Sequence, residues 1–151
     1  MAVQDSIIQL YSRGPTKGGS MRRKFEYRLD MQLPLAANRE ITDLARCRLF
    51  CLPEQQQAWM AGYNVYHGLA KQRVLGDVAL EQCLAEPDRL PRQWREFEIC
   101  FWGCLLQAGR GRVGIRTMYW NRVSWTAGFR FTDSFFTRHQ PALVIDEPAN
   151  P

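Results

Sequence analysis

Residues 93–137 read QWREFEICFWGCLLQAGRGRVGIRTMYWNRVSWTAGFRFTDSFFT. Apolar and polar residues alternate along much of this stretch, the pattern of strands that lay one face on a core. The glycine-rich AGRGR at 108–112 and the Asn121–Arg122 pair interrupt the alternation and read as turns. The stretch therefore predicts three antiparallel strands, near 95–105, 113–120 and 123–132.

The faces of these strands follow from the same alternation. The second half of the 95–105 strand is apolar on both sides, so this strand is expected in the centre of the sheet. In the last strand one face is predicted to lie on the core; its members are Val123, Trp125, Ala127, Phe129 and Phe131.

Two further strands are predicted upstream. KFEYRLDMQL, at 24–33, alternates without a break, and SIIQLYS, at 6–12, forms a shorter strand. The turn-forming, basic segment 13–20 between them is expected to be a flexible loop. The proline-rich segment 140–151 is expected to be an extended or disordered tail.

The middle of the chain predicts about three helices, at 39–51, 54–71 and 77–86. In the second helix one apolar stripe is expected to face the core; its members are Trp59, Tyr63, Tyr66 and Ala70. Strands, then helices, then an antiparallel meander predict an α+β fold with the helices packed on one face of an antiparallel sheet.

Length and composition favour one domain spanning 1–151, because 151 residues with 46% hydrophobic side chains support a single core. No apolar run is long enough to span a bilayer, and the first residues lack a signal-peptide pattern. Five cysteines without a disulfide framework favour a reducing compartment, so we expect free thiols.

The positive charge is concentrated in the same part of the chain as the strands. Between Leu105 and His139 there are six arginines and a single acid, Asp133. The charge of this stretch is therefore +5, which equals the net charge of the whole protein. Arginine suits phosphate groups and stacks on aromatic rings, so RNA or an anionic lipid surface is the expected partner. The same arginines could instead solvate the outer face of the sheet. The candidate contact residues are Lys17, Arg22, Arg23, Lys24, Arg110, Arg112, Arg116 and Arg130.

Catalytic and metal-binding patterns are weak by comparison. Cys47 and Cys51, and likewise Cys100 and Cys104, are four residues apart, and with Cys83 or His67 they could surround zinc. This spacing does not match the tight cysteine pairs of structural zinc sites, and cysteine is also a common core residue. The carboxylates of Glu96 and Glu98 share one strand face, which solvation explains more simply than glycoside hydrolysis. We therefore expect neither a cofactor nor an enzyme.

Two segments resemble the matrix proteins of rhabdoviruses: KFEYRLDMQL at 24–33 and REFEICFWGCLLQAGRGRVGIRTMYWNR at 95–122. The resemblance covers roughly residues 22–136. It implies a sheet packed on helices, no catalysis, self-association, and a basic surface that bridges a ribonucleoprotein to the inner face of a membrane. That contact is then assigned to Arg22, Arg23, Lys24, Arg110 and Arg112.

The resulting hypothesis is a viral structural protein of the matrix type, located in the virion and the host cytoplasm at the membrane periphery. A small intracellular protein that binds RNA or a host factor is the alternative, and an uncharacterised enzyme is third.

Overall fold

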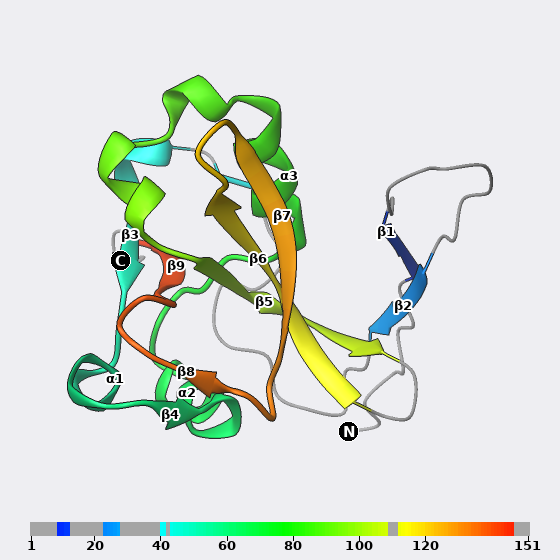
Figure 1. Ribbon diagram of the computed structural model, residues 1–151, viewed down its shortest axis with the longest axis vertical. Helices are drawn as coiled ribbons and strands as arrows, with labels where there is room; N and C mark the ends of the chain where they lie inside the picture. Colours follow the sequence, from blue (N-terminus) through cyan, green and yellow to red (C-terminus); the bar gives the residue numbers. More distant parts are fainter. Residues whose placement is uncertain (1–8, 13–22, 28–39, 42, 109–111, 147–151) are drawn as a thin grey trace, which may run out of the picture.

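A computed structural model describes residues 9–12, 23–27, 40–41, 43–108 and 112–146 (Figure 1). The predicted α+β class is confirmed. The strands are β1 Gln9–Ser12, β2 Arg23–Tyr27, β3 Cys47–Phe50, β4 Met60–Ala61, β5 Ile99–Ala108, β6 Arg112–Trp120, β7 Trp125–Phe131, β8 Phe135–Phe136 and β9 Ala142–Ile145. The helices are α1 Pro53–Gln57, α2 Gly62–Gly68 and α3 Asp77–Ala85, with the 3-10 turns η1 Leu44–Arg46, η2 Pro87–Arg89 and η3 Arg92–Glu96.

Strand β5 is the centre of the main sheet, as its two apolar faces predict. It pairs antiparallel with β2 and β6, and β1 and β7 continue the sheet on the two sides. It also pairs in parallel with β9, which carries β3 on its other edge. The sheet is therefore mixed, where the sequence predicted an antiparallel one, and part of the predicted 140–151 tail is a buried strand.

A bulge in β5 changes which residues face which side. Phe101 lies opposite Arg116, but Leu106 lies opposite Gly114, so β5 uses five residues where β6 uses two. The extra residues reverse the alternation beyond Trp102, which itself still packs on the same side as Cys100. As a result Leu105 packs on the same side as Cys100, although strict alternation would place it with Phe101.

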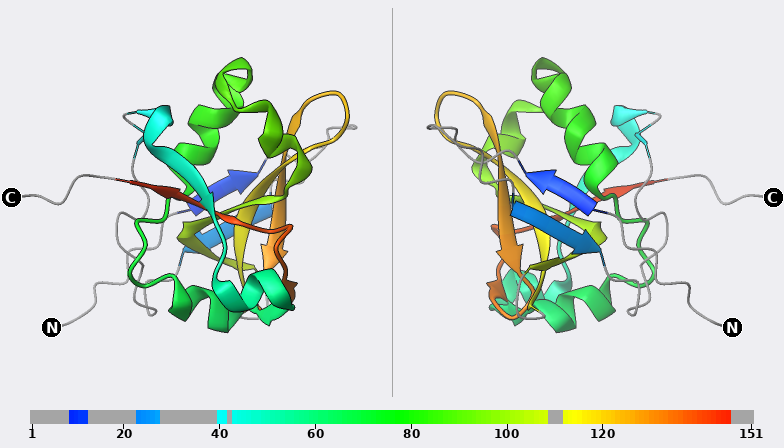
Figure 2. Two further views of the ribbon diagram at one scale, coloured as in Figure 1. Left: turned by 90° about the vertical axis from the view of Figure 1, so that its left-hand side faces the viewer. Right: turned by 90° about the vertical axis from the view of Figure 1, so that its right-hand side faces the viewer.

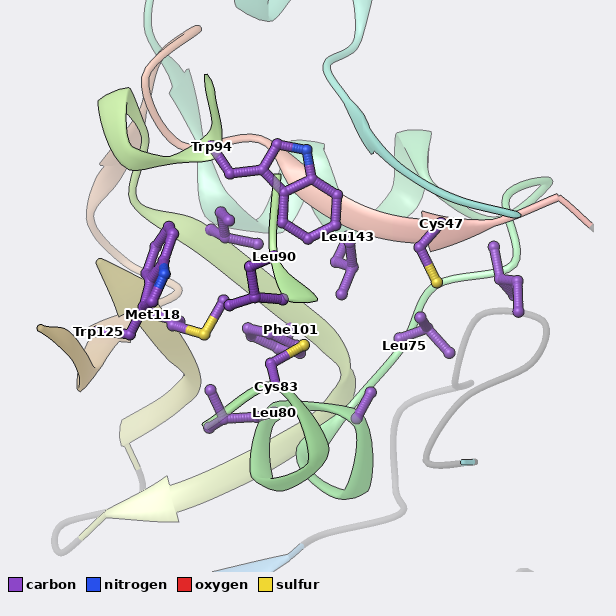
Figure 3. Close-up of a cluster of buried hydrophobic side chains, with 13 residues drawn as sticks. Cys47, Leu75, Leu80, Cys83, Leu90, Trp94, Phe101, Met118, Trp125 and Leu143 are labelled. Atoms are coloured by element: carbon purple, nitrogen blue, oxygen red, sulfur yellow. The ribbon is translucent and has the colours of Figure 1, made fainter. Parts of the chain in front are cut away.

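Helices cover both faces of the sheet, because β5 and β9 are apolar on both faces (Figure 2). On one face α3 packs Leu80 and Cys83 against Phe101, together with Trp94 from η3 (Figure 3). On the other face α2 packs Tyr66 and its neighbours against Trp102. The prediction that all helices share one face is therefore wrong.

The predicted helix at 39–51 is also wrong. The described part of this segment is the 3-10 turn η1, capped by the Asp43 carboxylate, followed by β3. Its apolar residues fit a helical period, but Cys47–Phe50 also fits a strand. Pairing of all four residues with β9 decides between the two, since strand preference depends on tertiary partners.

The predicted helix at 54–71 is divided into α1, β4 and α2. At the break, Met60 and Ala61 form β4 and pair with β8. A Cβ at Gly62, where α2 begins, would collide with the carbonyl oxygen of Thr132, so the start of α2 lies closer to the turn between β7 and β8 than another residue would allow. Tyr66 is buried as expected, whereas Trp59, Tyr63 and Ala70 of the same predicted stripe are exposed.

The remaining boundaries lie close to those predicted. The predicted helix at 77–86 is α3, and the predicted strand at 113–120 is β6. The start of the predicted strand at 95–105 is instead η3, and Val123 lies in the hairpin ahead of β7 with 82% of its surface exposed. Residues 28–33 of the predicted strand at 24–33 and residues 6–8 of the one at 6–12 lie outside the described residues, as does the predicted loop at 13–20. Among the described helices, none has both the length and the apolar character that crossing a membrane requires.

Candidate functional site

The predicted contact residue Arg112 is engaged within its own sheet. Its guanidinium lies 2.9 Å from the Asp133 carboxylate and 3.5 Å from the centre of the Phe131 ring. The hydrogen bond from Arg112 lowers the pKa of Asp133. Asp133, the one acid between Leu105 and His139, is therefore already paired with an arginine of the same stretch.

Arg116 joins β6 to helix α3. Its guanidinium lies 3.0 Å from the carboxylate of Asp77 and 2.8 Å from that of Glu81. The Arg116 side chain is only 18% exposed, so it is poorly placed to meet a large partner. Its role in this arrangement is to fix the start of α3 on the sheet.

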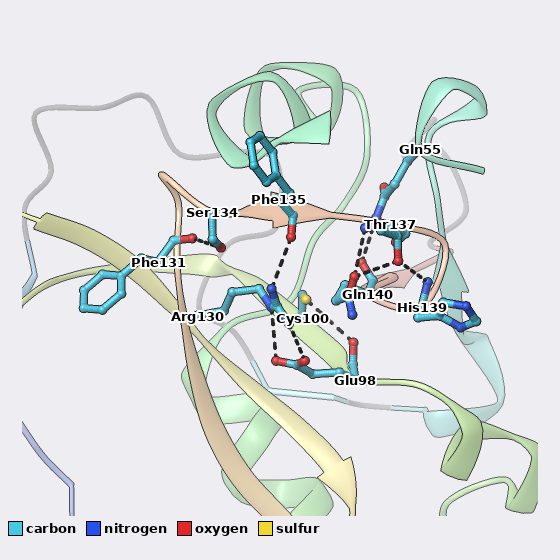
Figure 4. Close-up of polar contacts among 10 residues, drawn as sticks. All are labelled: Gln55, Glu98, Cys100, Arg130, Phe131, Ser134, Phe135, Thr137, His139 and Gln140. Atoms are coloured by element: carbon cyan, nitrogen blue, oxygen red, sulfur yellow. Dashed lines mark hydrogen bonds and ion pairs between the residues drawn. The ribbon is translucent and has the colours of Figure 1, made fainter. Parts of the chain in front are cut away.

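Arg130 is likewise held by neighbouring groups (Figure 4). It donates to both carboxylate oxygens of Glu98 and to the backbone oxygen of Phe135. The hydrogen bond with Glu98 raises the pKa of Arg130. Glu98, one of the two carboxylates that the sequence placed on a single strand face, is thus an ion-pair partner.

The other predicted contact residues are Lys17, Arg22, Arg23, Lys24 and Arg110. Arg23 and Lys24 are the first residues of β2, and Lys17, Arg22 and Arg110 lie outside the described residues. The assignment of anion contact to these positions stays a prediction.

Four arginines have no carboxylate within 4.0 Å in the described part of the chain: Arg92, Arg95, Arg122 and Arg138. All four are exposed. Arg92 and Arg95 belong to η3, which packs against β6, and Arg122 lies in the loop that ends β6. Arg138 lies elsewhere, between β8 and β9. We call Arg92, Arg95 and Arg122 the arginine surface.

A tryptophan pair supports the arginine surface. The Arg95 guanidinium lies 3.8 Å from the centre of the Trp120 ring, and Trp120 meets Trp125 edge to face at 5.8 Å. Trp125 is buried in the core, so the stack has a rigid base. A planar cation on an aromatic ring offers its outer face to a further flat group, such as a nucleobase, and its N–H groups to phosphate.

The hairpin that carries Arg122 is held by one side chain. The Asn121 carboxamide oxygen accepts hydrogen bonds from the backbone N–H groups of Val123 and Ser124, at 2.9 and 2.8 Å. Arg122 adopts a φ of 80°, a conformation that non-glycine residues rarely take. The loop thus holds the Arg122 backbone in a fixed, outward position. The sequence signalled a turn here, but nothing in it signalled η3, which supplies the other two arginines.

The cysteines and histidines do not form a catalytic or metal-binding group in the described residues. No three His, Cys, Asp or Glu side chains there are arranged to hold a metal ion. All five thiols are free, and burial raises the pKa of Cys83 to about 12. His67 packs against the rings of Tyr63 and Tyr66, and His139 is exposed.

A shallow pocket of about 80 Å³ lies between the η1 region and α3. Its walls include Leu44, Cys83 and Leu90, with the Glu86–Arg89 ion pair at its edge. Neither histidine lines it.

Comparison with protein-family models, with curated proteins and with solved structures finds no match to this chain.

Proposed function

We propose that the protein is a non-enzymatic structural protein of the viral matrix type, which self-associates and bridges a ribonucleoprotein to an anionic membrane surface. The observation that carries the proposal is the arginine surface. It consists of three exposed arginines without a carboxylate partner in the described chain, and one of them, Arg95, stacks on Trp120.

The ion pairs of Arg112, Arg116 and Arg130 explain why the proposal rests on the arginine surface instead. A guanidinium that already shares protons with a carboxylate must give up that partner before it can bind phosphate, whereas Arg92, Arg95 and Arg122 need not. Phosphate-bearing surfaces are common to RNA and to anionic lipids, so one arginine surface suits either side of such a bridge.

The second candidate is an RNA-binding accessory protein without a membrane role. The specific observation in its favour is the stack itself, because base stacking on an aromatic or guanidinium plane is typical of single-strand binding.

Co-sedimentation and sedimentation velocity distinguish the two candidates. The purified protein is mixed with phosphatidylserine vesicles and, separately, with a short single-stranded RNA, at low and at high salt. A matrix-type protein binds both and forms larger assemblies as its concentration rises. Tight RNA binding by a small defined species, without vesicle binding, favours the accessory protein, and failure to bind either contradicts both.

A further inference from the structure

A second surface, away from the arginines, consists of exposed aromatic side chains. Trp59 is 62% exposed and Phe135 is 54% exposed, and their ring centres lie 4.2 Å apart. Tyr63, 60% exposed, is the fourth residue after Trp59 in the chain, and its ring packs against His67. In Figure 4 the Phe135 ring points away from the Arg130–Glu98 pair. We call Trp59, Tyr63 and Phe135 the aromatic ridge.

The two-stranded ribbon of β4 and β8 builds this ridge. Met60 lies opposite Phe136, and Ala61 lies opposite Phe135. Successive residues of a strand point to opposite sides, so fully buried Phe136 anchors the ribbon in the core while Phe135 faces outward. The exposure of Phe135 is therefore set by the register of a ribbon that is anchored on its inner side.

The segments that carry the ridge are uncharged. From Gln55 to Ala70 there is no Asp, Glu, Lys or Arg, in a chain of which 23% is charged, and Ser134–Thr137 contains none either. A nucleic acid or an acidic peptide would find no complementary charge on these segments. The occupant of the ridge is therefore expected to be uncharged where it touches the protein.

The exposed area of the ridge distinguishes between two possible occupants, a second copy of this chain and a lipid bilayer. Three aromatic side chains, each a little over half exposed, offer roughly 250–450 Å². A stable dimer buries about 800 Å² on each partner, so the ridge alone is too small for a second copy. The boundary between headgroups and acyl chains of a bilayer accepts Trp and Tyr rings without a complementary shape.

We propose that the aromatic ridge inserts into the headgroup–acyl boundary of a lipid bilayer. The inference deepens the proposed membrane contact and rests on it, but it assigns that contact to an uncharged site separate from the arginine surface. Binding through the ridge is consequently insensitive to salt and does not require anionic lipid, whereas binding through arginine falls steeply with salt.

The test uses vesicles of pure phosphatidylcholine, which carry no net charge, and measures the fraction of full-length protein that co-sediments at low and high salt. Wild type should bind equally at both salt concentrations. The affinity of the double variant Trp59→Ser, Phe135→Ser for these vesicles should be lower by about tenfold or more, because two apolar rings are removed from the contact. The matched control is Tyr119→Ser, Val123→Ser, which removes two exposed apolar side chains outside the ridge and should bind like wild type.

Three results would overturn the inference. They are no sedimentation of wild type with phosphatidylcholine, equal binding by the ridge variant and wild type, and an equal loss of binding in the control variant. A ridge variant that keeps vesicle binding but loses a dimer in sedimentation velocity would assign the ridge to a second copy. Failure of the proposed function is distinguishable, because it would show as unchanged binding of Arg92→Gln, Arg95→Gln, Arg122→Gln to RNA and to phosphatidylserine, whereas the inference is tested with phosphatidylcholine alone.

Discussion

At the residue scale, Asp77 shows how a buried carboxylate positions a helix. It is 5% exposed and pairs with Arg116, while Glu81 reaches the same guanidinium from the surface. Breaking a buried ion pair is expensive, and losing an exposed one is not. Arg116→Ala should lower the free energy of unfolding by about 3 kcal/mol, and Glu81→Ala by less than about 1 kcal/mol. Urea unfolding measures both, and equal losses would contradict the structural role of Arg116.

The thiols supply a second prediction at this scale. Burial raises the pKa of Cys83 from 9.0 to about 12, so the thiol loses its proton more easily in the unfolded state than in the folded state. The stabilising contribution is complete below pH 9 and is lost as the pH rises toward 12. The urea midpoint should therefore fall from pH 8 to pH 10, and it should fall less in Cys83→Ala. A variant with the same pH dependence as wild type would show that Cys83 ionises freely.

At the scale of the element, Gly62 lets helix α2 begin close against the backbone of the turn between β7 and β8. Gly62→Ala places a methyl group against the Thr132 backbone and should lower the free energy of unfolding by about 1–3 kcal/mol. Gly68→Ala is the matched control, since the new methyl group meets only the end of the Leu52 side chain. Circular dichroism during thermal unfolding compares the two, and a larger loss in Gly68→Ala would contradict the close approach.

The β6–β7 hairpin separates two residues that simple alternation places together. Val123 lies in the exposed loop, and Trp125 is buried beside Trp120. Trp125→Ala should lower the free energy of unfolding by about 3–5 kcal/mol, whereas Val123→Ala should change it by less than about 0.5 kcal/mol. Similar losses in chemical denaturation would return Val123 to the core face that the alternation predicted.

Elements that depend on their own residues were predictable from the sequence, and elements that depend on partners were not. Strand β6 and helix α3 carry a clear period and a clear stop. The sequence of β3 fits a helical period, and its pairing with β9 makes it a strand. Strand β9 itself lies in a proline-rich segment that was predicted to be a tail. The α+β class therefore follows from local pattern, but the parallel β5–β9 pair and the two-sided core do not.

At the scale of the whole molecule, the sequence located a basic region but could not separate paired from unpaired arginines. Arg112, Arg116 and Arg130 lie in that region and are neutralised by acids distant in sequence, such as Asp77 and Glu98. Arg92 and Arg95 lie outside it, in a turn that no periodicity marks. Charge density along the chain therefore does not predict charge available on the surface.

The most direct test of the arginine surface is the salt dependence of binding to a short single-stranded RNA. Each phosphate contact adds roughly 0.7 to the slope of log affinity against log salt concentration. The variant Arg92→Gln, Arg95→Gln, Arg122→Gln should reduce the slope by about 2, while Arg112→Gln should leave it unchanged because Asp133 and Phe131 already hold that guanidinium. A slope that falls in Arg112→Gln and persists in the triple variant would contradict the assignment and indicate that Arg112 contacts the RNA instead.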